Sequence, residues 1–100
     1  MFIIETDHET INFANIESIG LKYDYVDETE KEYEYRIIAT GAKQDHLIYN
    51  DIDRDKAETV LFYINKAIIE GYTSIVIYSG MSYVQCAKNG KFTDEWDIVE

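Results

Sequence analysis

The strongest constraint on the fold is one helical pattern in a chain that is otherwise patterned for strands. In the stretch DIDRDKAETVLFYINKAIIEG, apolar residues recur at steps of three and four, which is typical of an amphipathic helix. Asp53 or Asp55 can cap its start, and Asp55 with Glu58 has the spacing of a capping box. Gly71 stands where a left-handed C-terminal cap belongs. We therefore predict one amphipathic helix over about 54–70. Its apolar stripe consists of Ala57, Val60, Leu61, Ile64, Ala67 and Ile68.

Segments on both sides of this helix alternate apolar and polar residues with the period of two that indicates strands. A bulge is expected near Asn15, where the alternation is interrupted. The β-β-β-β-α-β-β-β order predicts a single α+β domain over residues 1–100. We expect an antiparallel or mixed sheet of about six to seven strands with the helix packed on one face. The expected strands lie at residues 2–4, 19–25, 31–41, 44–49, 73–78, 82–88 and 91–96.

The last two of these strands form a predicted C-terminal β-hairpin. Asn89-Gly90 suits the positive φ angles of a type I′ turn. A two-residue loop would place Tyr83 opposite Trp96 and Ala87 opposite Phe92.

The stretch YDYVDETEKEYEYR, residues 23–36, concentrates tyrosine and negative charge. It holds four tyrosines and six carboxylates against one lysine and one arginine. In paired strands the tyrosines fall on one face and most of the charge on the other. The tyrosines can then line the inner face of a hairpin whose charge points outward.

Two interpretations of this hairpin stay open: a solvated outer face, or a surface that binds a partner. Outward strand faces are often charged, and charge also protects sheet edges from aggregation. On the other hand, carboxylates two residues apart on a strand face are roughly 6.5–7 Å apart, similar to phosphates along a DNA strand. The geometry thus permits DNA mimicry. The candidate partner-binding residues are Asp24, Tyr25, Asp27, Glu28, Glu30, Glu32 and Glu34.

The charge balance narrows the class of partner. Twenty acidic residues against nine basic ones give a net charge of −11. Binding of nucleic acid or of an anionic membrane requires clustered lysine and arginine, so neither is expected. A basic protein surface is favoured, with an encounter that salt weakens.

A calcium-loop pattern begins at Asp51-x-Asp53-x-Asp55 but is not completed. The sixth position is Lys56 instead of glycine, and the twelfth is Phe62 instead of glutamate. Carboxylates at a helix start are in any case favoured by the helix dipole. We therefore interpret these residues as caps and assign no metal site and no cofactor.

The remaining reactive residue types lack the spacing of a catalytic or metal site. His8 and His46 are the only histidines and form no ligand motif. Cys86 is the only cysteine and alternates within an apolar strand, which predicts a buried, inert thiol. With no nucleophile elbow and no phosphate-binding glycine loop, we expect a protein that is not an enzyme.

The cysteine count, the N-terminal residues and the length of the apolar runs indicate the cellular compartment. One cysteine allows no intramolecular disulfide, which suits a reducing compartment. MFIIETDHE has no basic region of a signal peptide, and no apolar run approaches the ~20 residues that span a bilayer. We expect a soluble, cytoplasmic protein.

Several segments of the first 70 residues together resemble small pleckstrin-homology-like proteins of Gram-positive bacteria and their phages. The segments are INFANIESIGL, EYRIIAT, LIYNDI and the Asp-capped helix. The resemblance implies a phage or mobile-element setting. It also implies a scaffold or assembly module as one function.

Two functional hypotheses follow. In the first, the protein is a non-enzymatic inhibitor or regulator that occludes the basic surface of a bacterial nucleic-acid-binding protein. In the second, it is a pleckstrin-homology-like scaffold or assembly module that binds partners through a sheet edge. Steep loss of affinity with salt favours the first, and salt-resistant binding favours the second.

Overall fold

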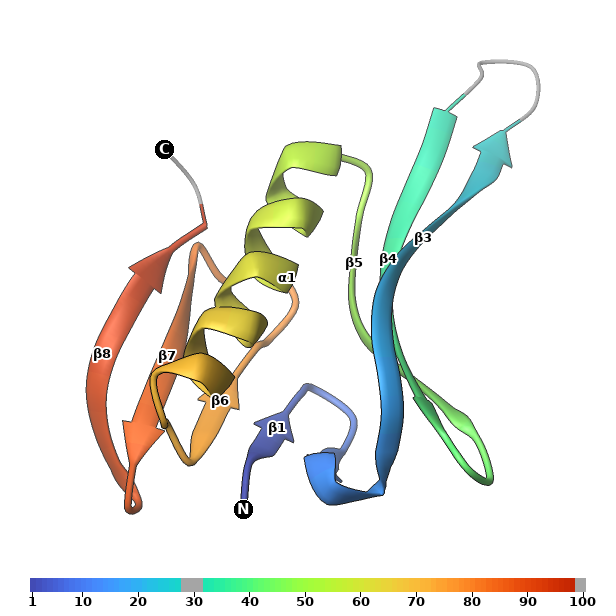
Figure 1. The fold of residues 1–100 in the computed structure, drawn as a ribbon. Helices are drawn as coiled ribbons and strands as arrows, with labels where there is room; N and C mark the ends of the chain where they lie inside the picture. Colours follow the sequence, from blue (N-terminus) through green and yellow to red (C-terminus); the bar gives the residue numbers. More distant parts are fainter. Residues whose placement is uncertain (28–31, 99–100) are drawn as a thin grey trace.

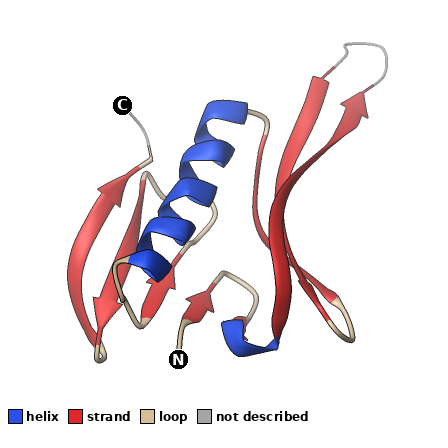
Figure 2. Cartoon of the chain, viewed as in Figure 1, coloured by secondary structure: helices blue, strands red, loops and turns tan. Residues whose placement is uncertain are grey.

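The computed structural model describes residues 1–27 and 32–98 and has the α+β composition predicted from the sequence. Five strands precede the long helix and three follow it, one strand more before the helix than the sequence pattern predicted (Figures 1 and 2). The elements are β1 (Ile3–Glu5), β2 (Thr10–Asn12), the 3-10 turn η1 (Phe13–Asn15), β3 (Ile16–Asp27), β4 (Glu32–Gly41), β5 (Asp45–Asp51), α1 (Arg54–Ile69), β6 (Ser74–Val76), β7 (Tyr83–Lys88) and β8 (Lys91–Asp97).

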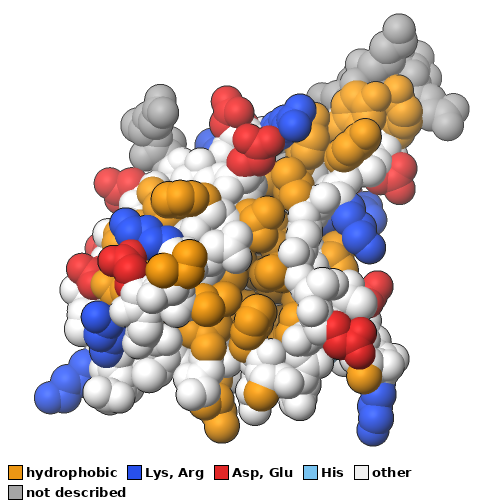
Figure 3. All heavy atoms as spheres, in the orientation of Figure 1, with side chains coloured by type: hydrophobic (Ala, Val, Ile, Leu, Met, Phe, Trp, Pro, Cys, Tyr) orange, Lys and Arg blue, Asp and Glu red, His pale blue; other side chains and the backbone are white. Residues whose placement is uncertain are grey.

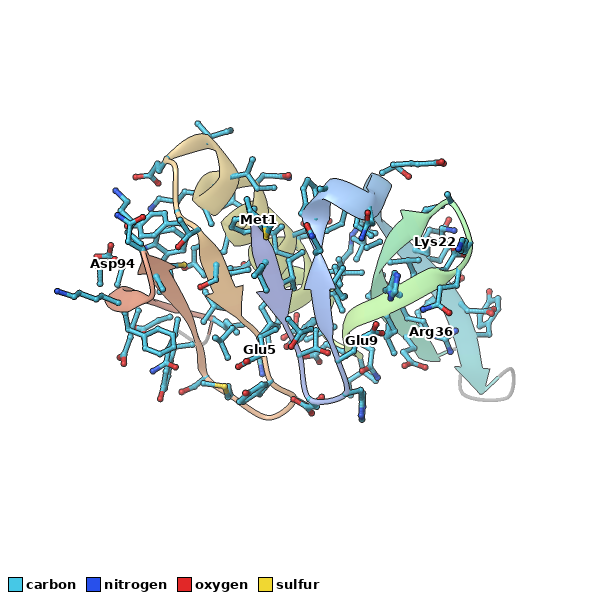
Figure 4. All side chains as sticks on the ribbon, turned by 90° about the horizontal axis from the view of Figure 1, so that it is seen from below. Met1, Glu5, Glu9, Lys22, Arg36 and Asp94 are labelled. Carbon is cyan, nitrogen blue, oxygen red and sulfur yellow. The ribbon has the colours of Figure 1, made fainter. Side chains whose placement is uncertain are left out.

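The strands form two sheets, which corrects the expectation of a single sheet of six to seven strands. A five-stranded sheet has the order β2-β1-β6-β7-β8, and a three-stranded sheet has the order β3-β4-β5. All neighbouring strands are antiparallel except β1 and β6, so the larger sheet is mixed. Seen from below, the strands of the larger sheet lie in a row, with the three-stranded sheet beyond β2 (Figure 4).

The division into two sheets begins at the position where a bulge was expected. Residues Phe13–Asn15 form a 3-10 turn, and the Asn12 side chain accepts a hydrogen bond from the Ala14 backbone N–H at 3.0 Å. This turn separates β2 from β3. A bulge would have kept one strand in one sheet, whereas a full turn redirects the chain into another.

Helix α1 begins and ends where the capping residues indicate. Its N-cap is Asp53, whose carboxylate accepts hydrogen bonds from the backbone N–H groups of Asp55 and Lys56 at 2.9 and 3.4 Å. Of the two predicted caps, the structure therefore selects Asp53.

At the C-terminal end of α1 the chain turns through a left-handed glycine. Gly71 has φ +80°, and its N–H donates to the Ile68 carbonyl at 3.2 Å. The N–H of Tyr72 donates to the Ala67 carbonyl at 3.0 Å. These two bonds make a Schellman motif, as expected for glycine at this position.

The core lies where α1 packs in the angle between the two sheets (Figure 1). The helix contacts β3, β4 and β5 of the smaller sheet and β6 and β7 of the larger one. One helix thus supplies the apolar surface that joins both sheets. The largest fully buried side chains are Ile4, Ile37, Val60, Ile64, Ile75, Ile77, Val84 and Cys86.

The C-terminal hairpin has the predicted turn but a different register. Asn89 and Gly90 have φ angles of +53° and +80°, as a type I′ turn requires. An irregularity between Cys86 and Ala87 shifts the pairing by one residue, so Trp96 lies opposite Val84 and not opposite Tyr83. Since neighbouring strand residues point to opposite faces, the shift places Trp96 on the core side with the fully buried Val84.

Candidate functional site

Four tyrosines form a cluster at the far end of the β3–β4 hairpin. Tyr23 lies opposite Tyr35 and Tyr25 opposite Tyr33, so all four rings lie on one face. The rings of Tyr25 and Tyr33 stack with centroids 4.4 Å apart, and Tyr23 meets the Tyr33 ring edge-on at 5.6 Å. We call Tyr23, Tyr25, Tyr33 and Tyr35 the tyrosine cluster.

The tyrosine cluster continues the core face of β3 and β4 into solvent. Leu21 and Tyr35 on that face still pack against the core, whereas Tyr23 and Tyr25 are 69% and 50% exposed. Figure 1 shows why: β3 and β4 lean away from α1 at this end, so the helix no longer covers them. The expectation that the tyrosines line an inner face therefore applies to Tyr35, and Tyr23 and Tyr25 form an exposed aromatic surface.

The hydroxyl groups of the cluster are linked as well as the rings. The Tyr33 hydroxyl donates a hydrogen bond to the Tyr25 hydroxyl at 2.7 Å. This hydrogen bond is the largest cause of a raised pKa of Tyr33. The stacked and hydrogen-bonded pair presents two rings with little rotamer freedom left to lose on binding.

The opposite face of the hairpin carries charge of both signs. Asp24 and Glu34 lie opposite each other, and Lys22 and Arg36 form the next pair on that face. The Glu34 carboxylate accepts hydrogen bonds from Arg36 at 3.0 Å and from the Asn50 side chain at 2.7 Å. These partners, Arg36 first, lower the pKa of Glu34.

The structure thus divides the predicted site between two faces. Tyr25 lies on the face of the tyrosine cluster, whereas Asp24 and Glu34 lie on the other. Asp27 and Glu32 pair at the end of the strands. The side chains of Asp27 and Glu32, and the whole of Glu28 and Glu30, lie outside the described residues.

Within the described part of the hairpin, the row of carboxylates expected for a phosphate mimic ends at Asp24 and Glu34. Lys22 and Arg36 are two residues from Asp24 and Glu34 on the same strand face. Figure 4 labels both cations on the three-stranded sheet. On each strand a cation therefore lies directly beside the last carboxylate of the row.

A second feature, which the sequence reasoning missed, is an apolar band between α1 and β3. Figure 3 shows apolar side chains running continuously between these two elements up to the hairpin end. Both elements also have partly buried apolar residues that pack against the core, namely Ile19 and Leu21 of β3 and Leu61 and Ile68 of α1. The signal in the sequence was the apolar stripe of the helix, which includes Leu61 and Ile68.

The helix adds exposed apolar residues beyond this stripe. Phe62 and Ile69 are 61% and 83% exposed, and Ile52, just before the helix, is 67% exposed. Exposed apolar residues that gather on one side of a small protein are a recurrent mark of an interaction surface.

The start of α1 adds negative charge at the end of the molecule where the β3–β4 hairpin projects (Figure 1). Its first turn and the residues before it carry Asp51, Asp53 and Asp55, and Glu58 follows one turn later. Asp53 is used as the helix cap, and Glu58 pairs with Arg54 at 2.8 Å. The caps interpretation of the aspartates is confirmed for Asp53.

The titratable residues elsewhere serve the fold. His46 Nδ1 lies 2.7 Å from a Glu9 carboxylate oxygen, which links β5 to the β1–β2 connection across the boundary of the two sheets. His8 is exposed. Cys86 is buried, and this burial raises the pKa of its thiol to about 12, so the predicted inert thiol is confirmed as a buried one.

In residues 1–27 and 32–98, no group of three or more histidine, cysteine, aspartate or glutamate side chains is arranged to hold a metal ion. Nor does the described chain contain a helix of the length and apolar composition needed to cross a membrane.

Comparisons with protein-family models, with curated proteins and with solved structures found no match to this chain. The pleckstrin-homology-like resemblance therefore remains a prediction from the sequence.

Proposed function

We propose that this protein is a non-enzymatic inhibitor or regulator that binds a basic protein surface. Its target would be a bacterial nucleic-acid-binding protein, and its source a phage or another mobile element. The observation that carries the proposal is the tyrosine cluster, an exposed aromatic surface on a chain with a net charge of −11. The action is occlusion of a surface that otherwise contacts phosphates.

Tyrosine is suited to this task because its ring gives a large, rigid contact area and its face attracts cations. Tyrosine is enriched among the residues that dominate binding energy at interfaces. An arginine or lysine over an aromatic face gains about 0.5–1 kcal/mol at exposed sites and more when desolvated. The stacked Tyr25 and Tyr33 rings are positioned to receive such side chains.

The negative charge would act mainly on the rate of encounter. A chain of net charge −11 attracts a basic surface over distance, and salt screens this attraction. Lys22 and Arg36 lie directly beside Asp24 and Glu34, which favours aromatic and electrostatic recognition over close imitation of a long phosphate row.

The alternative is the pleckstrin-homology-like scaffold that binds through a sheet edge. One observation favours it: β3 pairs only with β4 among the described strands, so its other edge is open. A scaffold that uses this edge by backbone pairing alone would hold its partner with little salt dependence.

The first experiment is an affinity pulldown from bacterial lysate at low salt with elution by a salt gradient. We expect a basic nucleic-acid-binding protein that elutes at moderate salt and is displaced by duplex DNA. Recovery of a salt-resistant partner, or of no basic protein, would contradict occlusion by charge.

The captured protein is then tested against variants. Tyr23→Ala with Tyr25→Ala should weaken binding about tenfold or more, as expected for central aromatic contacts. Phe92→Ala is the matched control, because Phe92 is 62% exposed on β8 of the other sheet. Charge reversal at Glu28 and Glu30 tests the contribution of the negative charge between β3 and β4. It should reduce the association rate most strongly at low salt.

A further inference from the structure

The open edge of β3 is long and regular enough to pair with another strand. Irregularities interrupt its pairing with β4 between Ile16 and Ser18 and between Tyr25 and Asp27. Between them, the eight residues from Ser18 to Tyr25 pair without a shift. They span roughly 26 Å at the usual rise per strand residue.

This edge borders the apolar band. Tyr63 of α1 hydrogen-bonds to the Asp97 carbonyl of β8, and its ring contacts Trp96, so that side of the helix faces the larger sheet. Leu61 and Ile68 are seven positions apart on another side of the helix and pack partly exposed against the core. The side of the helix that carries them lies away from Tyr63, and α1 contacts the smaller sheet through β3, β4 and β5.

From these two features we propose that the basic partner binds through an extended segment that pairs with Ser18–Tyr25 of β3. The inference rests on the proposed function and specifies its mode of binding. Side chains of the added strand alternate: apolar residues face α1 and fill the band, and polar residues continue the opposite face of the sheet.

The charges on β3 dictate where the basic residues of this segment lie. The outward residues of the paired stretch are Ser18, Gly20, Lys22 and Asp24. A basic side chain is favoured beside Asp24 and disfavoured beside Lys22. The segment therefore carries its positive charge at the end that lies next to the tyrosine cluster.

Charge complementarity selects a basic partner over a second copy of this chain. Two copies would bring together net charges of −11 each. They would also have to pair edges that each carry Lys22 and end in a bulge, features that hinder self-association of edge strands.

The test uses a synthetic peptide of eight residues in which leucine alternates with polar residues. Lysine occupies the polar position nearest the N-terminus and threonine the other three, so that the lysine can lie beside Asp24 without a second one beside Lys22. The control has the same composition with the lysine at the polar position nearest the C-terminus. Binding of the labelled peptides to the full chain is followed by fluorescence anisotropy.

We expect one of these two peptides to bind about two- to fivefold more tightly, because only one strand direction brings the lysine to the Asp24 end. Preference for the first peptide indicates antiparallel pairing, and preference for the second indicates parallel pairing. Equal affinities, or no binding of either, would overturn the proposal.

Methylation of the peptide backbone tests strand pairing directly. In one derivative of the preferred peptide the leucine amides are N-methylated, and in the other the lysine and threonine amides are. Alternate amides of a strand point to opposite edges, so one derivative should lose about tenfold or more in affinity and the other should bind as before. If neither derivative loses affinity, the peptide does not pair with β3.

Hydrogen exchange and one matched pair of variants locate the peptide. The alternate amides of Ser18–Tyr25 that point away from β4 should gain protection on binding. Tyr23→Ser should weaken binding while Phe92→Ser does not. Protection that rises with protein concentration in the absence of peptide would assign the edge to a second copy instead. If the pulldown yields a basic protein but its binding leaves these amides unprotected, the proposed function stands and this mode of binding is wrong.

Discussion

At the scale of single residues, the ionisable side chains around the hairpin are held by specific neighbours. Glu34 illustrates this, since Arg36 and Asn50 both donate to its carboxylate. In the sequence, Glu34 is one of six carboxylates within residues 23–36. Only the pairing of β4 with β5 brings Asn50 opposite Arg36 and so distinguishes Glu34 from the others.

The lowered pKa of Glu34 gives a testable pH dependence. A carboxylate with a lowered folded-state pKa stabilises the fold above its unfolded pKa of about 4.3, and this contribution is lost as the pH falls through the folded pKa. Arg36→Gln should raise the pKa of Glu34 towards its unfolded value and so reduce the part of the stability that is lost as the pH falls below that value. Carboxyl NMR titration measures the pKa, and Lys22→Gln on the same face is the control. An unchanged Glu34 pKa in Arg36→Gln would rule out this ion pair as the cause.

The thiol of Cys86 is a second residue-scale case, where burial dominates. Burial raises its pKa to about 12, and the side chain is fully inaccessible. We expect a thiol reagent at pH 8 to modify native Cys86 on the order of a hundredfold more slowly than the urea-unfolded chain. Comparable rates for the native and the unfolded chain would show that β7, the strand that carries Cys86, opens readily in the folded protein.

At the scale of elements, caps and turns behave as local chemistry requires. The Asp53 cap, the Gly71 Schellman motif and the Asn89-Gly90 turn all form where their residue types indicate. The irregularities of strand pairing do not follow from residue type. The shift between Cys86 and Ala87 has no marker of its own, because it is set by the burial of Trp96 on the core side.

Gly90 offers a clean test of turn chemistry. Nothing lies within 4 Å of a Cβ built at Gly90, so a substitution there meets backbone strain at φ +80° and no clash. Gly90→Ala should lower the free energy of unfolding by about 1–2 kcal/mol. Urea denaturation measures this change.

Gly20→Ala is the matched control for this turn variant. Gly20 also has free space around its Cβ position but lacks a positive φ. Its substitution should leave stability unchanged or slightly raised, because alanine reduces the freedom of the unfolded chain. Equal losses in both variants would contradict the assignment of strain to the turn.

At the scale of the whole molecule, α1 is the element that both sheets share. Removing apolar volume from its buried side should therefore affect the two sheets together. Ile64 is fully buried in this position.

Ile64→Ala should lower the free energy of unfolding by about 2–5 kcal/mol. Hydrogen exchange should show β4 and β7 losing protection by similar free energies, since they belong to different sheets that share this contact. Phe62→Ala, on the exposed side of the same helix, should change stability by less than about 0.5 kcal/mol. Loss of protection in only one sheet would mean that the sheets unfold independently.

The candidate site was accessible to sequence reasoning only in part. Alternation placed the tyrosines on one face and Asp24 and Glu34 on the other, because side-chain direction in a strand follows from the period of two. Which tyrosines are exposed depends on how far the helix extends over β3 and β4, and no local pattern encodes that distance.

The sequence by itself determined the α+β class, the helix with its caps, the C-terminal hairpin turn and the acidic, tyrosine-rich stretch. Each depends on residues close together in the chain, where propensity, capping and turn geometry act directly. Only the tertiary structure decided that the strands separate into two sheets, that β1 pairs in parallel with β6, and that an apolar band beside β3 remains open. These features arise from packing between residues far apart in sequence. One helix is shared between two sheets, and the surface that it leaves uncovered depends on the arrangement of all three.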